Sequence, residues 1–156
     1  MIAPYSPATN PAFECTIRGG FNDRPSADIH PTVWREMRLR GSVPVVIATP
    51  NGTTSAIAAK MGEHYTSLIN IRQTAEEMGF HQYNDSTAWL TIDWAQVLPA
   101  SIVERIDQDK NFAQLWRSLT FERACELLNS VRKKRSPSSI KLETQKLIRI
   151  VLSGHQ

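Results

Sequence analysis

The 156-residue chain has few cysteines and no long apolar run. Its two cysteines, Cys15 and Cys125, lie far apart in sequence and outside any metal-ligand spacing. This argues against a disulfide framework and a zinc site, and we expect both thiols to be buried as small apolar groups. Because no run of about 18 apolar residues occurs, the sequence offers no candidate for a membrane span.

Sequence motifs of common enzyme classes are also absent. There is no Gly-x-Ser-x-Gly nucleophile elbow, Walker loop or dinucleotide fingerprint, and Gly19-Gly20 is explained by a turn. The four histidines are scattered without an i, i+4 pair: His30, His64, His81 and His155. We therefore predict no catalytic residues, no metal site and no cofactor, and we expect a protein that is not an enzyme.

The N-terminal residues lack the features of a targeting signal. Residues 1–11 contain neither a basic nor an apolar segment, and three prolines among them disfavour a helix. The composition, with 41% hydrophobic and 21% charged residues, is that of an ordinary globular protein. We expect residues 1–12 to form a loose leader and the protein to be cytoplasmic.

Residues 13–95 follow a strand-like period of two. Apolar or β-branched residues mark five extended segments: residues 13–17, 43–49, 55–59, 68–71 and 88–92. Asn51-Gly52 is a hairpin signal between the second and third of these, since a type I′ turn needs positive φ. Two short helices are expected over residues 31–38 and 73–78. We expect these residues to form a small β-barrel domain, because closing the sheet removes its edges.

Beyond Trp94 the period changes to about 3.6, which is typical of helices. Two successive segments repeat the spacing i, i+3, i+4, i+7: Phe112, Leu115, Trp116 and Leu119, then Phe121, Ala124, Cys125 and Leu128. Thr120 is a suitable N-cap for the second segment. We predict a short C-terminal helical bundle over residues 98–154, with the domain boundary between Asp93 and Pro99.

The last helix is predicted to begin at Ser136-Pro137, an N-cap followed by proline at the first helical position, and to end at Gly154. Its apolar side is expected to contain five residues: Ile140, Thr144, Leu147, Ile148 and Val151. The four tryptophans are possible stacking platforms for bases, but we expect all of them to pack in the core: Trp34, Trp89, Trp94 and Trp116.

Positive charge is concentrated in the last third of the chain. Residues 1–99 carry seven Lys/Arg and nine Asp/Glu, a net charge of −2, whereas residues 100–156 carry eleven and six, a net charge of +5. The candidate nucleic-acid-binding residues are a first patch, Arg132, Lys133, Lys134, Arg135 and Lys141, and a second patch, Arg35, Arg38 and Arg40. The alternative is that cations near residue 132 only complement the carbonyl end of a helix.

The order of these elements resembles the bacterial YdeI/OmpD-associated family. The residues that carry the resemblance in the strand half are 29–33, Val43-Pro44-Val45-Val46 with Pro50-Asn51-Gly52, Leu68-Ile69-Asn70-Ile71 leading to Met78-Gly79, and Asn84-Asp85. In the helical half they are residues 99–119 and Lys134-Arg135-Ser136-Pro137-Ser138 followed by Lys141. The chain departs from the family pattern at Asn84-Asp85, where the family has Gly-Asp, and at Ser138-Ser139-Ile140-Lys141, where it has further arginines.

The resemblance implies an α+β fold, in which a small AbrB-like, double-split β-barrel precedes a short helical domain labelled for bacteriocin protection. It also implies a non-enzymatic binding or stress-protection role with an acidic protein partner. The residues themselves leave two alternatives open: a DNA- or RNA-binding regulator that uses the basic patch, and a small-molecule-binding barrel or enzyme. None of these hypotheses specifies an oligomeric state.

Overall fold

The structure is a computed structural model that describes residues 4–18, 26–28, 39, 41–49, 52–61, 65–69 and 85–154. The chain has an α+β fold and divides into two compact units. The strand unit comprises Ala12–Met37 and Gly41–Asp93, and the helical unit comprises Met1–Pro11, Arg38–Arg40 and Trp94–Gln156. The chain therefore leaves the helical unit at Ala12, contributes Arg38–Arg40 to it, and returns to it finally at Trp94.

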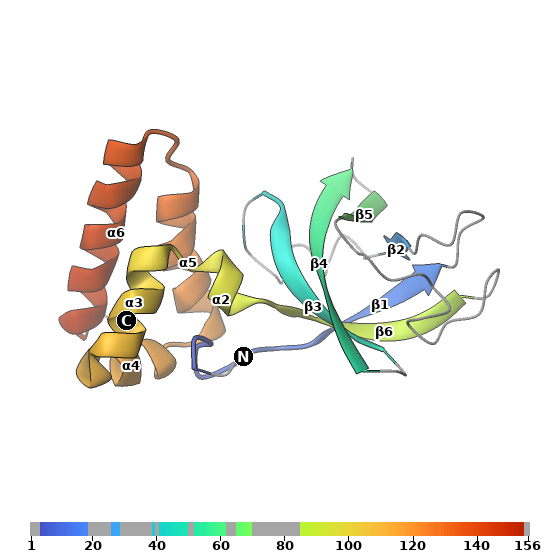
Figure 1. The fold of residues 1–156 in the computed structure, drawn as a ribbon, viewed down its shortest axis with the longest axis horizontal. Coiled ribbons are helices and arrows are strands. Elements are labelled where there is room, and N and C mark those ends of the chain that lie inside the picture. Colours follow the sequence, from blue (N-terminus) through green and yellow to red (C-terminus); the bar gives the residue numbers. More distant parts are fainter. Residues whose placement is uncertain are drawn as a thin grey trace. The chain divides into compact units, whose positions relative to one another are not determined.

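Four strands of the strand unit form a continuous antiparallel sheet (Figure 1). They are, in spatial order, β4 (Gly52–Met61), β3 (Val43–Thr49), β6 (Asp85–Ile92) and β1 (Phe13–Arg18). Two shorter strands extend this sheet, β5 (Tyr65–Ile69) beside β4 and β2 (Ser26–Asp28) beside β1. β2 and β5 pair with each other through Ala27 opposite Thr66, so each strand has two hydrogen-bonded neighbours.

Alternation along each strand explains the core of this unit. Seven inward side chains of β1, β3 and β6 are at most 4% exposed: Cys15, Val43, Val45, Ile47, Ala88, Leu90 and Ile92. Successive strand residues point to opposite faces of a sheet, so Trp89, next to Leu90, faces outward. Trp89 is 49% exposed, and the expectation that it packs in the core is wrong.

The strand segments predicted from the sequence are present with shifted ends. β4 and β6 are longer than expected, β5 begins three residues earlier, and the three-residue β2 was not predicted. The hairpin of β3 and β4 is confirmed, but its register pairs Thr49 with Gly52, so Gly52 is a strand residue with a φ of +125°. The two helices expected over residues 31–38 and 73–78 lie outside the described residues.

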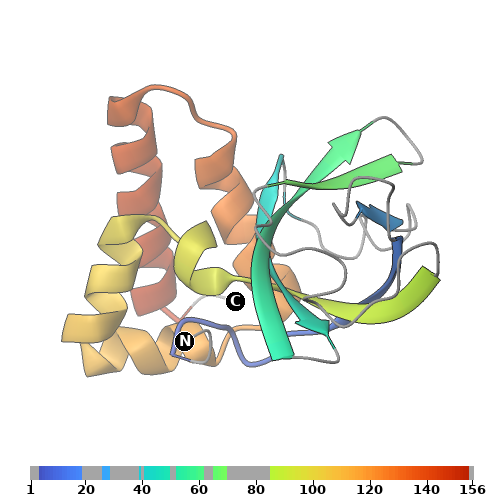
Figure 2. The same ribbon diagram turned by 45° about the vertical axis from the view of Figure 1, so that its right-hand side comes forward.

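The described part of the helical unit contains five helices: α2 (Trp94–Val97), α3 (Ala100–Gln108), α4 (Lys110–Arg117), α5 (Phe121–Arg132) and α6 (Pro137–Leu152). Figures 1 and 2 show α5 and α6 side by side, joined by a short loop. The predicted caps are confirmed, since Thr120 Oγ1 accepts the Arg123 N–H and Ser136 Oγ accepts the Ser139 N–H, each at 3.2 Å.

Two tryptophans and two phenylalanines occupy the centre of the helical unit. Trp94, Trp116 and Phe112 are fully buried and Phe121 is 3% exposed. The ring of Trp94 makes edge-to-face contacts with Trp116 and Phe121, with centroids 6.2 and 6.1 Å apart. The apolar pattern of α4 and α5 therefore has the core role that its spacing predicts.

Residues 4–11, expected to be part of a loose leader, are hydrogen-bonded to the helices. The indole N–H of Trp116 donates to the Tyr5 carbonyl at 2.8 Å, and that of Trp94 donates to Asn10 Oδ1 at 2.9 Å. The Ala8 N–H donates to the Leu119 carbonyl at 2.8 Å. A buried indole N–H needs an acceptor, and this segment supplies one to both tryptophans.

Candidate binding groove and basic surface

The structure places the first predicted basic patch at the junction of α5 and α6. Lys133 is the C-cap of α5, and its N–H donates to the Asn129 carbonyl at 3.1 Å. Lys133, Arg135 and Lys141 are exposed, whereas Lys134 is only partly exposed. The second predicted patch, Arg35, Arg38 and Arg40, lies outside the described residues. Three of the five cations in the first patch are thus fully available to a partner.

Arg132 differs from its neighbours in the basic run. Its side chain is partly buried, and this burial lowers the pKa of its guanidinium below the ordinary value, an effect that the nearby Cys125 opposes. The group still carries its charge at neutral pH, because a free guanidinium titrates far above it. Arg132 therefore contributes its positive charge to this surface, while its side chain is less accessible than those of Lys133 and Arg135.

Three cations of the helices lie close to a carboxylate of the same segment. Nε of Arg105 lies 3.2 Å from Asp109, Nη1 of Arg123 lies 3.1 Å from Glu126, and Nζ of Lys146 lies 3.4 Å from Glu143. All three pairs lie within a helix or at its end, at i, i+3 or i, i+4. Such exposed pairs contribute about 0.3–0.5 kcal/mol each.

Among the described residues, basic residues outnumber carboxylates most strongly in one segment. Residues 132–154 contain seven Lys/Arg and one Glu, a net charge of +6, and that Glu is Glu143 beside Lys146. We call this segment the basic surface. Lys141 and Arg149 are exposed on it, and neither has an ion pair within the described part of the chain.

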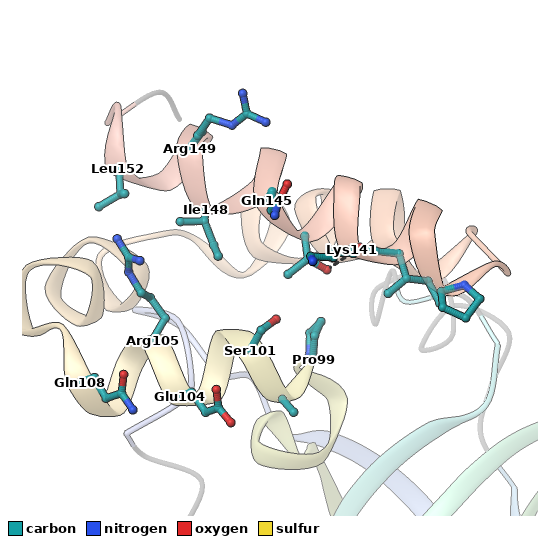
Figure 3. Close-up of a pocket in the computed structure, with 14 residues that line it drawn as sticks. Pro99, Ser101, Glu104, Arg105, Gln108, Lys141, Gln145, Ile148, Arg149 and Leu152 are labelled. Atoms are coloured by element: carbon teal, nitrogen blue, oxygen red, sulfur yellow. Dashed lines mark hydrogen bonds between the residues drawn. The ribbon is translucent and has the colours of Figure 1, made fainter.

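A groove of about 1100 Å³ runs between α3 and α6 (Figure 3). Its apolar lining residues are Pro99, Ala100, Pro137, Ile140, Ile148 and Leu152. Its neutral polar residues are Ser101, Gln108, Thr144 and Gln145, and its charged residues are Glu104, Arg105, Lys141 and Arg149. Figure 3 shows Arg105 reaching from α3 toward α6 and Ile148 pointing from α6 toward α3.

Part of the predicted apolar side of α6 is not covered by neighbouring helices, because it lines the groove. Thr144, Leu147 and Val151 are buried as expected, but Ile140 and Ile148 are only half-buried and line the groove. Leu152, one turn beyond Ile148, is 37% exposed. Neighbouring helices therefore cover one stripe of α6 and leave the adjacent apolar stripe open along the groove.

Arg105, Gln145, Arg149 and Leu152 were not predicted as site residues from the sequence. The sequence contained a signal for the groove: the apolar residues of α6 lie on two adjacent stripes. Because one packed helix covers about one stripe, part of this apolar side could be expected to stay uncovered. Lys141 is the one predicted site residue that the structure brings into the groove.

Other chemistry has little structural support among the described residues. They contain no cluster of three His, Cys, Asp or Glu side chains able to hold a metal ion, and all four histidines lie outside them. Cys15 and Cys125 are both buried free thiols, as predicted. Burial, with a smaller contribution from the charge of Glu14, raises the pKa of Cys15 to about 11, so this thiol is a poor nucleophile at neutral pH.

Comparisons with known proteins give no match: no family model, no curated protein and no solved structure matches this chain. In the described part of the chain, no helix has the length and apolar character that crossing a membrane requires.

Proposed function

We propose that this chain is a non-enzymatic binding protein whose helical unit engages an acidic protein partner. The observation that carries this proposal is the basic surface, where residues 132–154 have a net charge of +6. Two exposed leucines lie in the same segment as these cations, Leu142 at 50% and Leu152 at 37% exposure. A phosphate backbone offers little to apolar side chains, whereas an acidic protein surface commonly presents both carboxylates and apolar groups.

The proposal includes the family assignment and its implied role. We propose membership of the YdeI/OmpD-associated family, a cytoplasmic location, and a part in stress or bacteriocin protection. The pairing order β1-β2-β5-β4-β3-β6, in which β6 returns to β1, supports reading the strand unit as a small double-split β-barrel of the AbrB-like type. The small-molecule or enzyme alternative stays a prediction.

Nucleic-acid binding is the second candidate, and the exposure of Lys133, Arg135 and Lys141 favours it. If the five residues of the first patch neutralised five phosphates, affinity would fall roughly 500-fold between 50 and 200 mM salt. With three exposed cations the slope is near −2.7, and the fall is about 40-fold. Counting only the exposed cations thus makes the expected loss of affinity over this salt range about tenfold smaller.

Titration of the full chain with two labelled probes tests the proposal. The probes are a 20-residue glutamate peptide and a 20-base-pair duplex, each followed by fluorescence anisotropy at 50, 100 and 200 mM NaCl. We expect the peptide to bind, and Lys133→Gln to weaken it about two- to fivefold, the effect of one exposed ion pair. Lys110→Gln, at the exposed start of α4, makes the same charge change outside the basic surface and serves as the control.

The outcomes separate the two candidates. Peptide binding that is sensitive to Lys133→Gln but not to Lys110→Gln supports the acidic-partner proposal. Tighter binding of the duplex, with a slope near −2.7, replaces it with nucleic-acid binding. If neither probe binds at 50 mM NaCl, the proposed function is wrong.

A further inference from the structure

We propose that the groove between α3 and α6 binds an amphipathic, acidic helix of a partner protein. This inference rests on the proposed function and names the partner's form and its binding site. The α6 wall of the groove extends from Pro137 to Leu152, a rise of about 22 Å, or about four helical turns. At about 1100 Å³ and open along its length, the groove is larger than most small-molecule pockets and fits a chain segment.

The two walls favour a helix over an extended peptide. Both are helices, in which backbone N–H and C=O groups already bond to each other, so a strand-like peptide finds no free backbone edge to pair with. An inserted helix, by contrast, satisfies its own backbone and needs only an apolar stripe. Ile140, Ile148 and Leu152 supply the complementary apolar contacts along α6.

The charges along the groove favour an acidic occupant. Lys141 and Arg149 lie eight residues apart on α6, about 12 Å along its axis. Arg105 extends from α3 toward the end of α6 that carries Ile148 and Leu152. Glu104 is the one carboxylate among the lining residues. A partner helix with carboxylates separated by about two turns would therefore place them near Lys141 and Arg149.

Arg105 has remaining capacity to pair with such a carboxylate. Its Nε lies 3.2 Å from Asp109 Oδ2 but is not in hydrogen-bonding geometry, and among the described residues it has no other acceptor. The side chain is 43% exposed, so the rest of the guanidinium fork is accessible from the groove. A carboxylate from the partner can bond this fork without displacing a hydrogen bond of Nε.

The experiment uses the full chain and three labelled 16-residue peptides. The first is a helix-forming peptide with leucines at positions 2, 6, 9 and 13 and glutamates at positions 4, 5, 8, 11 and 12. The second has glutamine in place of every glutamate, and the third has glutamine in place of every leucine. We expect the first peptide to bind about tenfold more tightly than either of the others at 150 mM NaCl, measured by anisotropy.

Two matched pairs of variants locate the binding site. Leu152→Glu changes the groove, whereas Leu142→Glu makes the same change on α6 outside it. Lys141→Gln and Lys146→Gln form the second pair, since Lys146 lies outside the groove beside Glu143. We expect about tenfold weaker binding for Leu152→Glu and two- to fivefold weaker binding for Lys141→Gln. Leu142→Glu and Lys146→Gln also lie on the basic surface, and each should weaken binding less than its counterpart in the groove.

Circular dichroism of each variant checks that the helices are intact, and all four side chains are exposed enough to be replaced. Equal effects within each pair would overturn the groove proposal and leave general acidic binding, the proposed function, in place. Equal binding of the first and third peptides would overturn it too, because the apolar lining would then contribute nothing. The surface would be assigned to nucleic acid instead if the duplex displaced the first peptide and if Lys141→Gln and Lys146→Gln weakened duplex binding equally.

Discussion

The tryptophans of the strand unit and of the helical unit differ in burial. Trp89 of the strand unit is 49% exposed on the outer face of the sheet, whereas Trp94 and Trp116 of the helical unit are fully buried. In the strand unit the backbone period decides which side chains are covered. In the helical unit, burial also requires acceptors for two indole N–H groups, and a segment distant in sequence supplies them.

The two units also differ in the surface they expose. Among the sheet positions whose exposure is described, most exposed residues are small or hydroxyl-bearing: Glu14, Ala48, Gly52, Thr53, Ser55, Thr87 and Trp89. The helical unit instead exposes the basic surface and the groove. Among the residues whose exposure is described, the cations that the proposed function uses therefore lie on the helical unit.

The largest expected effect is on stability, when a buried and an exposed tryptophan are each replaced by alanine. Trp116→Ala should reduce the free energy of unfolding by about 3–5 kcal/mol, because it leaves a large cavity in the core. Trp89→Ala should cost less than about 1 kcal/mol, since an exposed side chain loses few contacts. Urea unfolding followed by circular dichroism measures both. A similar loss for the two variants would mean that the outer face around Trp89 is covered in solution.

The stability of the strand unit at alkaline pH is expected to depend on its buried cysteine, Cys15. The pKa of the buried Cys15 is raised from about 9 to about 11, so the unfolded chain loses this proton before the folded chain does. The stabilisation is fully present below pH 9 and is lost as the pH rises to 11, by about 2–3 kcal/mol. We expect Cys15→Ala to show a shallower decline in stability over this window than the parent chain. Parallel declines would show that Cys15 ionises equally easily in both states.

A smaller effect is expected where the helical unit holds its N-terminal segment. Asn10→Ala removes the acceptor of the buried Trp94 indole N–H and should destabilise the unit by about 1–3 kcal/mol. Asn10→Asp keeps an oxygen at this position and should recover most of the loss. Thermal unfolding monitored by tryptophan fluorescence provides the readout. If both substitutions were neutral, the hydrogen bond between Asn10 and Trp94 would contribute nothing to stability.

Local patterns predicted much of the fold. Thr120 and Ser136 were recognised as N-caps because a cap depends on residues two or three positions away, and the structure confirms both hydrogen bonds. The stripes of α4 and α5 were predicted for the same reason, since residues at i, i+3 and i+4 share a helix face. The class α+β followed from the change of period near Trp94.

The features that were missed depend on contacts between distant residues. Nothing near Asn10 in the sequence indicates that an indole 84 positions later needs its side-chain oxygen. The groove was missed because the spacing of Ile140 and Ile148 shows that they share a face of α6, while the extent of α3 decides whether that face is covered. For Trp89 a local signal existed, because the alternation that buries Leu90 places Trp89 outside.

The hydrogen bonds that join residues 4–11 to the rest of the helical unit also have a consequence for synthesis of the chain. Residues 4, 5 and 9 meet partners 102 to 113 positions later. A ribosome adding about 5–20 residues per second takes roughly 5–20 s to make that length, during which the entire strand unit is produced. The strand unit can therefore form its sheet while this segment still lacks its partners. The helical unit is completed last, although one of its segments emerges before any strand.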